Sequence, residues 1–182
     1  MTPLAWGRKV APAFRDRVRA IADGLGCSPS DLMACMAWET GRTFSASVKN
    51  GAGSGAVGLI QFMPQTAGLL HTTTAKLAAM TALAQLDYVD LYFRPWRGGL
   101  HNLGDLYCAI LWPAGVGKPD TATLFEAGGD HPKLYLQNEG LDLNHDHDIT
   151  RGEVTTAQNC SRLRLEVLRN TAEIGISTIS DR

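Results

Sequence analysis

Residues 28–41 read Ser-Pro-Ser-Asp-Leu-Met-Ala-Cys-Met-Ala-Trp-Glu-Thr-Gly, which is the helix with the clearest start and end in the chain. A serine comes first, where its hydroxyl can accept a hydrogen bond from a free backbone N–H, and Pro29 suits the first helical position. Leu32 and Met36 are four residues apart and would share a buried face. Gly41 favours termination. The stretch therefore predicts a helix that ends near Gly41.

Apolar residues at helical spacing continue on both sides of this stretch. They occur at Phe14, Val18, Ile21 and Leu25, at Leu83, Leu86, Val89 and Phe93, and at Val154, Ala157, Cys160, Leu163 and Val167. An almost wholly apolar helix is expected from about Gly104 to Leu111, in the centre of the fold. The sequence shows no convincing strand pair and no internal repeat. We therefore predict a mainly α single domain over residues 1–182, with little or no sheet.

Composition and charge exclude several classes of protein. Apolar residues make up 45% of the 182 and charged residues 19%, which excludes a disordered chain. The net charge of −1 argues against a nucleic-acid partner. No apolar run is long enough to span a bilayer, and Arg8 and Lys9 interrupt the stretch that a signal peptide would need. We expect a monomer without membrane insertion that starts in the cytoplasm of the cell that makes it.

Glu39 is the only carboxylate in residues 32–86, and it lies on the inward face of the predicted helix. A carboxylate in that position is costly unless it is paired or neutral. Met36 and Trp38 would help to desolvate it, and the negative end of the helix dipole opposes a further negative charge, so its pKa should rise. A raised pKa suits a general acid near neutral pH. The plainer alternative is a half-exposed glutamate at a helix end, or one paired with Arg42.

A glycine-rich loop follows, and residues 51–58 read Gly-Ala-Gly-Ser-Gly-Ala-Val-Gly. These glycines permit positive φ and a close approach of a ligand to the backbone. The order Gly53-x-Gly55-x-x-Gly58 formally matches a dinucleotide fingerprint. A helix rather than a strand precedes it, however, and no acidic residue follows at the spacing that would bind a ribose. We therefore reject a dinucleotide-binding interpretation.

The acid and the loop together resemble a known family. The matching elements are Trp38-Glu39-Thr40-Gly41, the Phe44-Ser45 pair, and Gly51 to Ala67, which ends in Gly58-Leu59-Ile60-Gln61-Phe62-Met63-Pro64-Gln65-Thr66-Ala67. This order is similar to that of the lysozyme-like lytic transglycosylases, whose hallmark ends in Gly-Leu-Met-Gln-x-Met-Pro-x-Thr-Ala. It is closest to the soluble-lytic-transglycosylase type of bacteriophage lysins, or endolysins. Weaker similarity extends from Trp6 to about Lys118. The resemblance implies a lysozyme-like fold of the goose-lysozyme and transglycosylase type.

The resemblance also implies a bacteriolytic enzyme whose partner is the glycan strand of peptidoglycan. Glu39 would protonate the β-1,4 glycosidic oxygen between N-acetylmuramic acid and N-acetylglucosamine. It would then take a proton from the sugar's own 6-hydroxyl, which gives a 1,6-anhydro product without a cofactor. Many glycosidases use two carboxylates, and Asp87, Asp90 or Asp105 could reach Glu39 only through folding. Such a lysin would be made in the bacterial host cytoplasm and act in the periplasm or cell wall after release or delivery.

Four residues are candidate glycan contacts: Ser54, Gln61, Tyr107 and Trp112. Ser54 is the best match for the serine that the family usually carries near its acid, and Gln61 belongs to the motif. Tyr107 and Trp112 offer aromatic faces on which sugars stack, as does Trp96; core packing is the alternative for each. The chain departs from the family's Ala-Tyr-Asn-Ala-Gly, because it reads Leu-Trp-Pro-Ala-Gly at 111–115.

Residues 142–153 read Asp-Leu-Asn-His-Asp-His-Asp-Ile-Thr-Arg-Gly-Glu, which follows the calcium-binding EF-hand loop. The metal ligands would be Asp142, Asn144, Asp146, Asp148 and Glu153, with Asp148 acting through its backbone carbonyl. Hard oxygen ligands suit calcium rather than zinc. His147 stands where the motif has glycine, which should weaken binding because the turn needs positive φ. The EF-hand-like segment would cover residues 138–156, with a helix from about Arg151.

Alternatives remain open for both sites. The acidic loop could be a solvated turn without metal, or a zinc site built from His131, His145 and His147. The enzyme could be a hydrolytic muramidase of the same fold. The chain could also be a cell-wall-binding module that has lost catalysis, or a calcium-regulated interaction protein.

Overall fold

The computed structural model describes residues 4–49, 51 and 53–155 and is mainly helical, as the sequence predicts. The longer helices are α1 (Pro12–Leu25), α2 (Pro29–Glu39), α5 (Ala82–Phe93) and α6 (Leu103–Leu111). The shorter ones are α3 (Pro64–Leu69), α4 (Thr74–Ala78), α7 (Pro132–Asn138) and α8 (Arg151–Thr155), with short 3₁₀ helices at Gly7–Lys9, Arg94–Trp96, Pro113–Gly115 and Glu139–Leu141. The strands β1 (Thr123–Glu126) and β2 (Asp148–Thr150) pair as a small antiparallel sheet.

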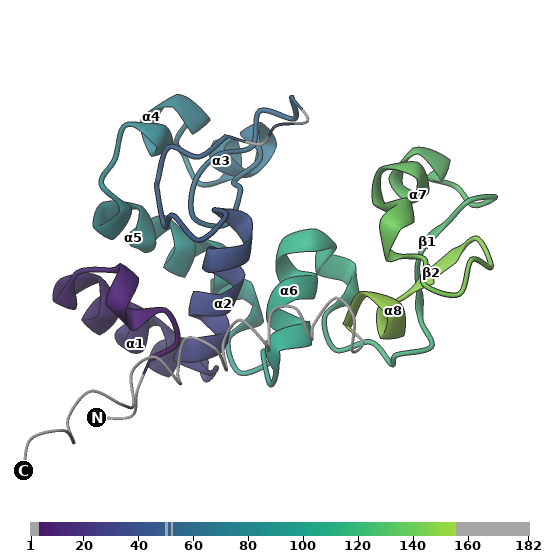
Figure 1. Cartoon of the computed structure of the whole chain (residues 1–182), viewed down its shortest axis with the longest axis horizontal. Coiled ribbons are helices and arrows are strands. Elements are labelled where there is room, and N and C mark those ends of the chain that lie inside the picture. The colour runs from purple at the N-terminus through teal and green to yellow at the C-terminus, as the bar shows by residue number, and fades with distance from the viewer. Residues whose placement is uncertain (1–3, 50, 52, 156–182) are drawn as a thin grey trace, which may run out of the picture.

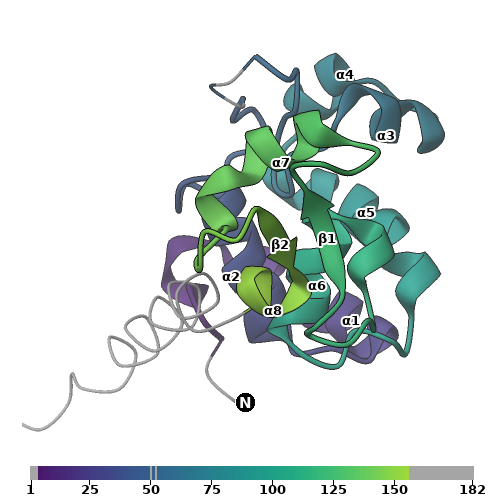
Figure 2. The same ribbon diagram turned by 90° about the vertical axis from the view of Figure 1, so that its right-hand side faces the viewer.

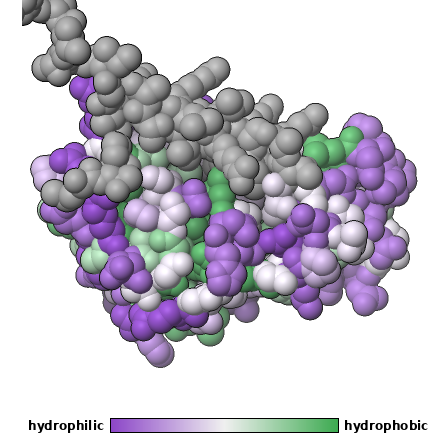
Figure 3. All heavy atoms as spheres, turned by 90° about the horizontal axis from the view of Figure 1, so that it is seen from below, coloured by the Kyte–Doolittle hydropathy of each residue, from purple (hydrophilic) through white to green (hydrophobic). Residues whose placement is uncertain are grey.

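The elements form a helical body and a smaller lobe (Figure 1). The body contains α1 to α6, and α2 contacts both α1 and α6. The lobe contains α7, α8 and the sheet, and Figure 2 shows β1 and β2 side by side with α7 and α8 at opposite ends of them. Because α8 also packs on α6, α6 joins the lobe to the body. The lobe end is mostly hydrophilic on the face in Figure 3, and apolar side chains gather nearer the middle.

Among the described residues, the helix faces predicted from apolar spacing are buried, with one exception. All four predicted residues of α1 are buried, and α6 is buried over most of its length. In α5 Leu86, Val89 and Phe93 are fully buried, whereas Leu83 is 41% exposed. A step of three residues leaves Leu83 rotated by about 60° from Leu86 around the helix axis. The prediction for Leu83 is therefore wrong, because the drift takes it off the buried stripe.

The sequence does not predict the sheet. β1 and β2 pair with Phe125 opposite Ile149, and both side chains are buried. Each strand has three or four residues with a single buried apolar side chain, which is too short for a period of two to be recognised. β2 also lies inside the acidic loop, so the sheet connects that loop to the segment after α6.

The last predicted helix begins at Arg151, as expected, and its Val154 is buried. Its other predicted apolar members, Ala157, Cys160, Leu163 and Val167, lie outside the described residues, as does the last residue of the 138–156 segment. Within the described ranges, no helix combines the length and the apolar character needed to cross a membrane.

Candidate functional site

Glu39 is the last residue of α2, and hydrogen bonds hold the chain that follows it. The Thr40 hydroxyl donates to the Met36 carbonyl at 2.6 Å and accepts from a backbone N–H four residues further on at 3.0 Å. Gly41 and Arg42 then adopt φ values of +55° and +70°, so two left-handed residues stop the helix. The helix end predicted near Gly41 therefore comes at Glu39, and the carboxyl group sits at a rigid helix terminus.

The Glu39 side chain is half-buried, and this burial raises the pKa of its carboxyl from 4.5 to about 7. The direction agrees with the sequence prediction, although Trp38, which was expected to cover the carboxyl, is 39% exposed. Burial, and then the charge of Glu39, raise the pKa of the Tyr92 phenol in α5 to about 12. The Tyr92 hydroxyl donates to the Ala109 carbonyl of α6 at 2.5 Å. The Tyr92 phenol is therefore near enough to feel the charge of Glu39, and nothing in the sequence marks Tyr92 for that place.

Glu39 makes no hydrogen bond or ion pair with any residue that the structure describes, so the alternative of a pair with Arg42 is not found. The aspartates that could have supplied a second carboxylate are engaged elsewhere: Asp87 with Arg17 at 2.9 Å, Asp90 with Arg94 at 3.1 Å and Asp105 with Arg151 at 2.8 Å. A neighbouring carboxylate would add to the pKa shift of Glu39, but burial alone is its cause. Among the described residues, no second carboxylate therefore acts beside Glu39.

The stability of the protein should depend on pH through Glu39. Below about pH 4.5 the folded and unfolded states both hold the proton, so Glu39 does not lower the free energy of unfolding. As pH rises from there to about 7, only the unfolded state releases the proton, and the free energy of unfolding falls. Above pH 7 the cost reaches about 3 kcal/mol, since each pKa unit is worth about 1.4 kcal/mol. Glu39→Gln removes this cost. Urea unfolding should therefore find the variant more stable than the natural chain at pH 8 and no more stable at pH 4; equal stabilities at both pH values would contradict the burial of Glu39.

The glycine loop turns back on itself between Val57 and Phe62. The N–H of each residue donates to the carbonyl of the other, at 3.1 and 2.8 Å. Gln61 closes the turn with its N–H on the Gly58 carbonyl at 3.1 Å, and α3 then begins with Pro64 at its first position. The motif of residues 58–67 is therefore a tight turn followed directly by a helix.

Gln85 of α5 is fully buried and holds this turn in place through side-chain hydrogen bonds. Its Oε1 accepts from the Leu59 N–H at 2.7 Å, and its Nε2 donates to the carbonyls of Ala46 at 3.1 Å and Leu77 at 2.9 Å. A Cβ at Gly58 would lie only 2.3 to 2.7 Å from the Gln85 side chain. The only sign of this role in the sequence is an amide within the apolar start of α5, and its partners come from three other segments.

Two of the candidate glycan contacts, Ser54 and Gln61, lie in the loop. Ser54 is exposed, and its hydroxyl accepts from the Ala56 N–H at 3.3 Å, with no hydrogen bond to Glu39. Gln61 adopts a φ of +51°, and its Nε2 donates to two loop carbonyls at 3.1 and 3.4 Å. The Oε1 of Gln61 is buried and has no partner among the described residues. Both side chains therefore brace the loop.

The aromatic candidates differ in what they offer to a ligand. Tyr107 of α6 is 8% exposed and belongs to the core. Trp112 follows α6, is half-buried and packs on Phe125 of β1 with ring centroids 5.3 Å apart. Trp96 is half-buried against Tyr92, with centroids 5.6 Å apart. Of the two aromatic residues predicted to contact glycan, Trp112 keeps more of its surface open than Tyr107.

Two hollows lie along the chain that follows α2. The first, of about 240 Å³, is lined by Ala37, Trp38, Gly41 and Arg42 at the end of α2. The second, of about 390 Å³, lies between the glycine loop and α4, where Lys49, Gly53, Gly55 and Thr74 contribute to its wall. The residues on either side of Glu39 and the glycine loop therefore both border open space.

The acidic loop, residues 142–153, is organised around its first residue. Asp142 is 3% exposed, and its Oδ2 accepts from the Tyr135 hydroxyl at 2.7 Å and from the His147 N–H at 3.1 Å. Its Oδ1 is buried and accepts no hydrogen bond of standard geometry from the described residues, although the backbone N–H groups of His145 and Asp146 also help to lower the pKa of this carboxyl. His147 adopts a φ of +69°, the left-handed conformation for which the motif carries glycine, as predicted. An unpaired buried carboxylate oxygen calls for a cation or a donor that protein atoms do not supply.

Glu153, the last residue of the loop, closes it onto its own backbone. One carboxylate oxygen accepts from the Leu143 N–H at 3.0 Å. The other accepts from the N–H and the hydroxyl of Thr150, at 2.9 and 2.8 Å. The two ends of the loop are therefore held together by the side chain that the sequence predicts as the final metal ligand.

The candidate metal ligands in the middle of the loop are joined to one another by hydrogen bonds. The Asn144 side chain accepts from the Asp146 N–H, and Asp146 accepts from the Asp148 N–H, both at 2.9 Å. Asp148 accepts from the Thr123 hydroxyl at 2.8 Å through one oxygen, and its other oxygen is buried and unpaired within the described residues. In this arrangement no three His, Cys, Asp or Glu side chains of the described chain converge as a metal site, the histidine set included. The acidic side chains would have to turn inward to share one ion.

Comparisons of this chain with protein-family models, with curated proteins and with solved structures found no match. What points to a function is therefore the geometry of Glu39 and of the acidic loop, together with the sequence motif that surrounds Glu39.

Proposed function

We propose that this protein degrades peptidoglycan, cleaving the β-1,4 bond between N-acetylmuramic acid and N-acetylglucosamine with Glu39 as the general acid. The observation that carries the proposal is the Glu39 carboxyl, which is half-buried, unpaired within the described chain and has a pKa of about 7. It holds a transferable proton at mildly acidic to neutral pH. The motif that follows Glu39 resembles that of the lysozyme-like lytic transglycosylases, so we also propose that fold for the helical body.

A single catalytic carboxylate favours transglycosylation over a hydrolysis that needs two carboxylates. Asp87, Asp90 and Asp105 are paired with arginines, which leaves Glu39 to act twice. Glu39 gives its proton to the glycosidic oxygen as that bond to the sugar C1 breaks. The resulting carboxylate takes the proton of the 6-hydroxyl as that oxygen bonds to C1, which forms the 1,6-anhydro ring and restores Glu39 without water. A hydrolytic muramidase would instead use water at C1.

We further propose that the protein is a bacteriophage-type lysin that reaches the cell wall after release or delivery. Purified Gram-negative peptidoglycan should lose turbidity when the protein is added at mildly acidic pH. Clearing should weaken as pH rises through about 7, because Glu39 loses the proton that it donates. A wall-binding module without catalysis would sediment with the peptidoglycan and leave its turbidity unchanged, which would contradict the proposal.

We also propose that the acidic loop binds calcium. The unpaired buried oxygen of Asp142 supports this, because Asp142 is the first residue of the loop and would be the first ligand. Asn144, Asp146, the Asp148 carbonyl and Glu153 would complete the oxygen set, with His147 already in the backbone conformation that the turn requires. The ion would neutralise clustered carboxylates and so stabilise the lobe.

Calcium should raise the melting temperature, by about 5 °C or more at a hundredfold excess over its Kd. Chelator should reverse this, and Asp142→Ala with Glu153→Gln should remove the response. The matched control, Asp130→Ala with Glu126→Gln, makes the same changes at exposed positions outside the loop and should keep it. His147→Gly should tighten binding because it relieves the positive φ. A melting temperature that ignores calcium in the natural chain would show that the loop is only an acidic turn.

A further inference from the structure

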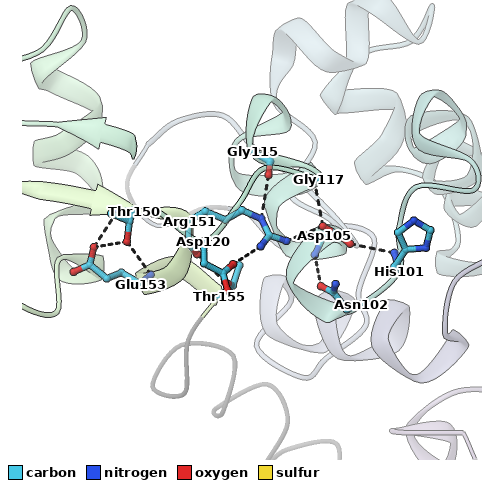
Figure 4. Close-up of polar contacts among 10 residues, drawn as sticks. All are labelled: His101, Asn102, Asp105, Gly115, Gly117, Asp120, Thr150, Arg151, Glu153 and Thr155. Atoms are coloured by element: carbon cyan, nitrogen blue, oxygen red, sulfur yellow. Dashed lines mark hydrogen bonds and ion pairs between the residues drawn. The ribbon is translucent and has the colours of Figure 1, made fainter. Parts of the chain in front are cut away.

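Arg151 joins the acidic loop to the helical body (Figure 4). Its guanidinium donates to the Asp105 carboxylate at 2.8 Å, to the Asp120 carboxylate at 2.5 Å and to the Gly115 carbonyl at 3.2 Å. These acceptors belong to α6, to the segment before β1 and to the turn after α6. Arg151 is 8% exposed and Asp105 2%. Arg151 lies two residues before Glu153, so the conformation of the loop fixes where this buried guanidinium stands.

Asp105 extends the connection to both ends of α6. One carboxylate oxygen accepts from Arg151 and from the Gly117 N–H, the latter at 3.4 Å. The other accepts from the His101 N–H at 3.1 Å, just before α6 begins. The carboxylate therefore ties the turns that enter and leave α6 to one arginine of the acidic loop (Figure 4).

A second route leads from the loop to the same place. β2 lies within the loop and pairs with β1, where Phe125 stands opposite Ile149. Phe125 packs on Trp112, with ring centroids 5.3 Å apart. Trp112 also caps the end of α6, three residues before the Gly115 carbonyl that Arg151 binds. Phe125 thus contacts the ring of Trp112, a candidate glycan contact, while Arg151 holds the backbone three residues beyond it, and both Phe125 and Arg151 are tied to the acidic loop.

We propose that Arg151 is a positioning residue that makes the placement of Trp112 and the end of α6 depend on a cation in the acidic loop. This rests on the calcium site proposed above. A cation that draws Asp142 and Glu153 together fixes the backbone at 150–153, and with it the guanidinium that holds Asp105 and Gly115. By thermodynamic linkage, calcium tightens the binding of a ligand that prefers the fixed position of Trp112, and that ligand tightens the binding of calcium by the same factor.

The test follows Trp112 directly in the full chain. The chain has four tryptophans, so fluorotryptophan labelling gives few ¹⁹F resonances, and single Trp→Phe variants assign them. Calcium chloride is titrated into the natural chain and into Arg151→Met/Asp105→Asn, which leaves no unpaired charge in the buried site. Arg94→Met/Asp90→Asn makes the same changes at a more exposed ion pair on the body and serves as the control.

In the natural chain and the control, calcium should shift the Trp112 resonance more than that of Trp38, which lies on α2 away from the lobe. Arg151→Met/Asp105→Asn should bind calcium within about threefold of the natural affinity, while its Trp112 shift falls at least about fivefold. Arg151→Lys should restore part of the shift.

An equal Trp112 shift in both proteins would overturn the proposal, and so would loss of calcium binding by the double variant, because Arg151 would then belong to the metal site. If the natural chain binds no calcium, the calcium site and this inference both fail. None of these readouts uses peptidoglycan, so their outcome does not bear on the assignment of Glu39 as the catalytic acid.

Discussion

Glu39→Gln is expected to fold and to lose peptidoglycan cleavage by about a thousandfold or more. The amide matches the volume of the carboxyl and stays neutral, which suits the half-buried end of α2. It cannot donate the proton that the leaving glycosidic oxygen needs. Initial rates of turbidity loss at about pH 6, where the natural carboxyl is mostly protonated, measure the effect.

The matched control is Glu126→Gln on the exposed edge of β1, which makes the same chemical change away from α2. It should keep the natural rate. Circular dichroism and the melting temperature confirm that Glu39→Gln is folded. If folded Glu39→Gln retains more than a few hundredths of the natural rate, Glu39 is not the acid.

Gly58→Ala should destabilise the protein by about 3 to 5 kcal/mol. Gly58 has a φ of +83°, which costs alanine about 1 kcal/mol. The new Cβ would also meet the Gln85 side chain at 2.3 to 2.7 Å and displace a group that makes three hydrogen bonds. Each buried hydrogen bond is worth about 1 kcal/mol, and leaving its partner unpaired costs more. Urea unfolding at neutral pH measures the loss.

Gly98→Ala separates the two causes. Gly98 has a φ of +75°, but a Cβ there meets nothing within 4 Å, so only the backbone penalty of about 1 kcal/mol applies. Gln85→Ala removes the side chain that collides with the new Cβ, so Gly58→Ala should cost less in that background than in the natural chain. Equal losses for Gly58→Ala and Gly98→Ala would show that Gln85 yields to the methyl group and does not fix the turn.

The longer helices α1, α2, α5 and α6 and the position of Glu39 could be predicted because their signals are local, whereas the sequence does not predict the short helices α3, α4 and α7. A serine before Pro29 and the glycine after Thr40 define α2, and the Ser28 hydroxyl does accept from the Asp31 N–H as an N-cap. The positive φ at His147 follows in the same way from its place in a loop motif. α3 begins inside the motif at 58–67 with Pro64 at its first position, but it has only six residues, too few for apolar spacing to reveal it.

The contacts that give the site its chemistry could not be predicted, because they join segments far apart in the chain. Gln85 is one amide in an apolar helix, and only folding brings Leu59 and Ala46 to it. Tyr92 of α5 feels the charge of Glu39 at the end of α2, but the apolar spacing that predicts α5 points to its neighbour Phe93 instead. Arg151 looks like an ordinary helix start in the sequence, and its three acceptors lie 31 to 46 residues away.

Mass spectrometry of the muropeptides released in ¹⁸O-labelled water tests most directly whether Glu39 cleaves a glycosidic bond without water. The natural chain should release 1,6-anhydro-muropeptides, each lighter by one water than a hydrolysed product and free of ¹⁸O, and Glu39→Gln should release none. Reducing ends that carry ¹⁸O would show hydrolysis in place of transglycosylation. Identical release by Glu39→Gln, or none by the natural chain, would contradict the assignment of Glu39 as the catalytic acid.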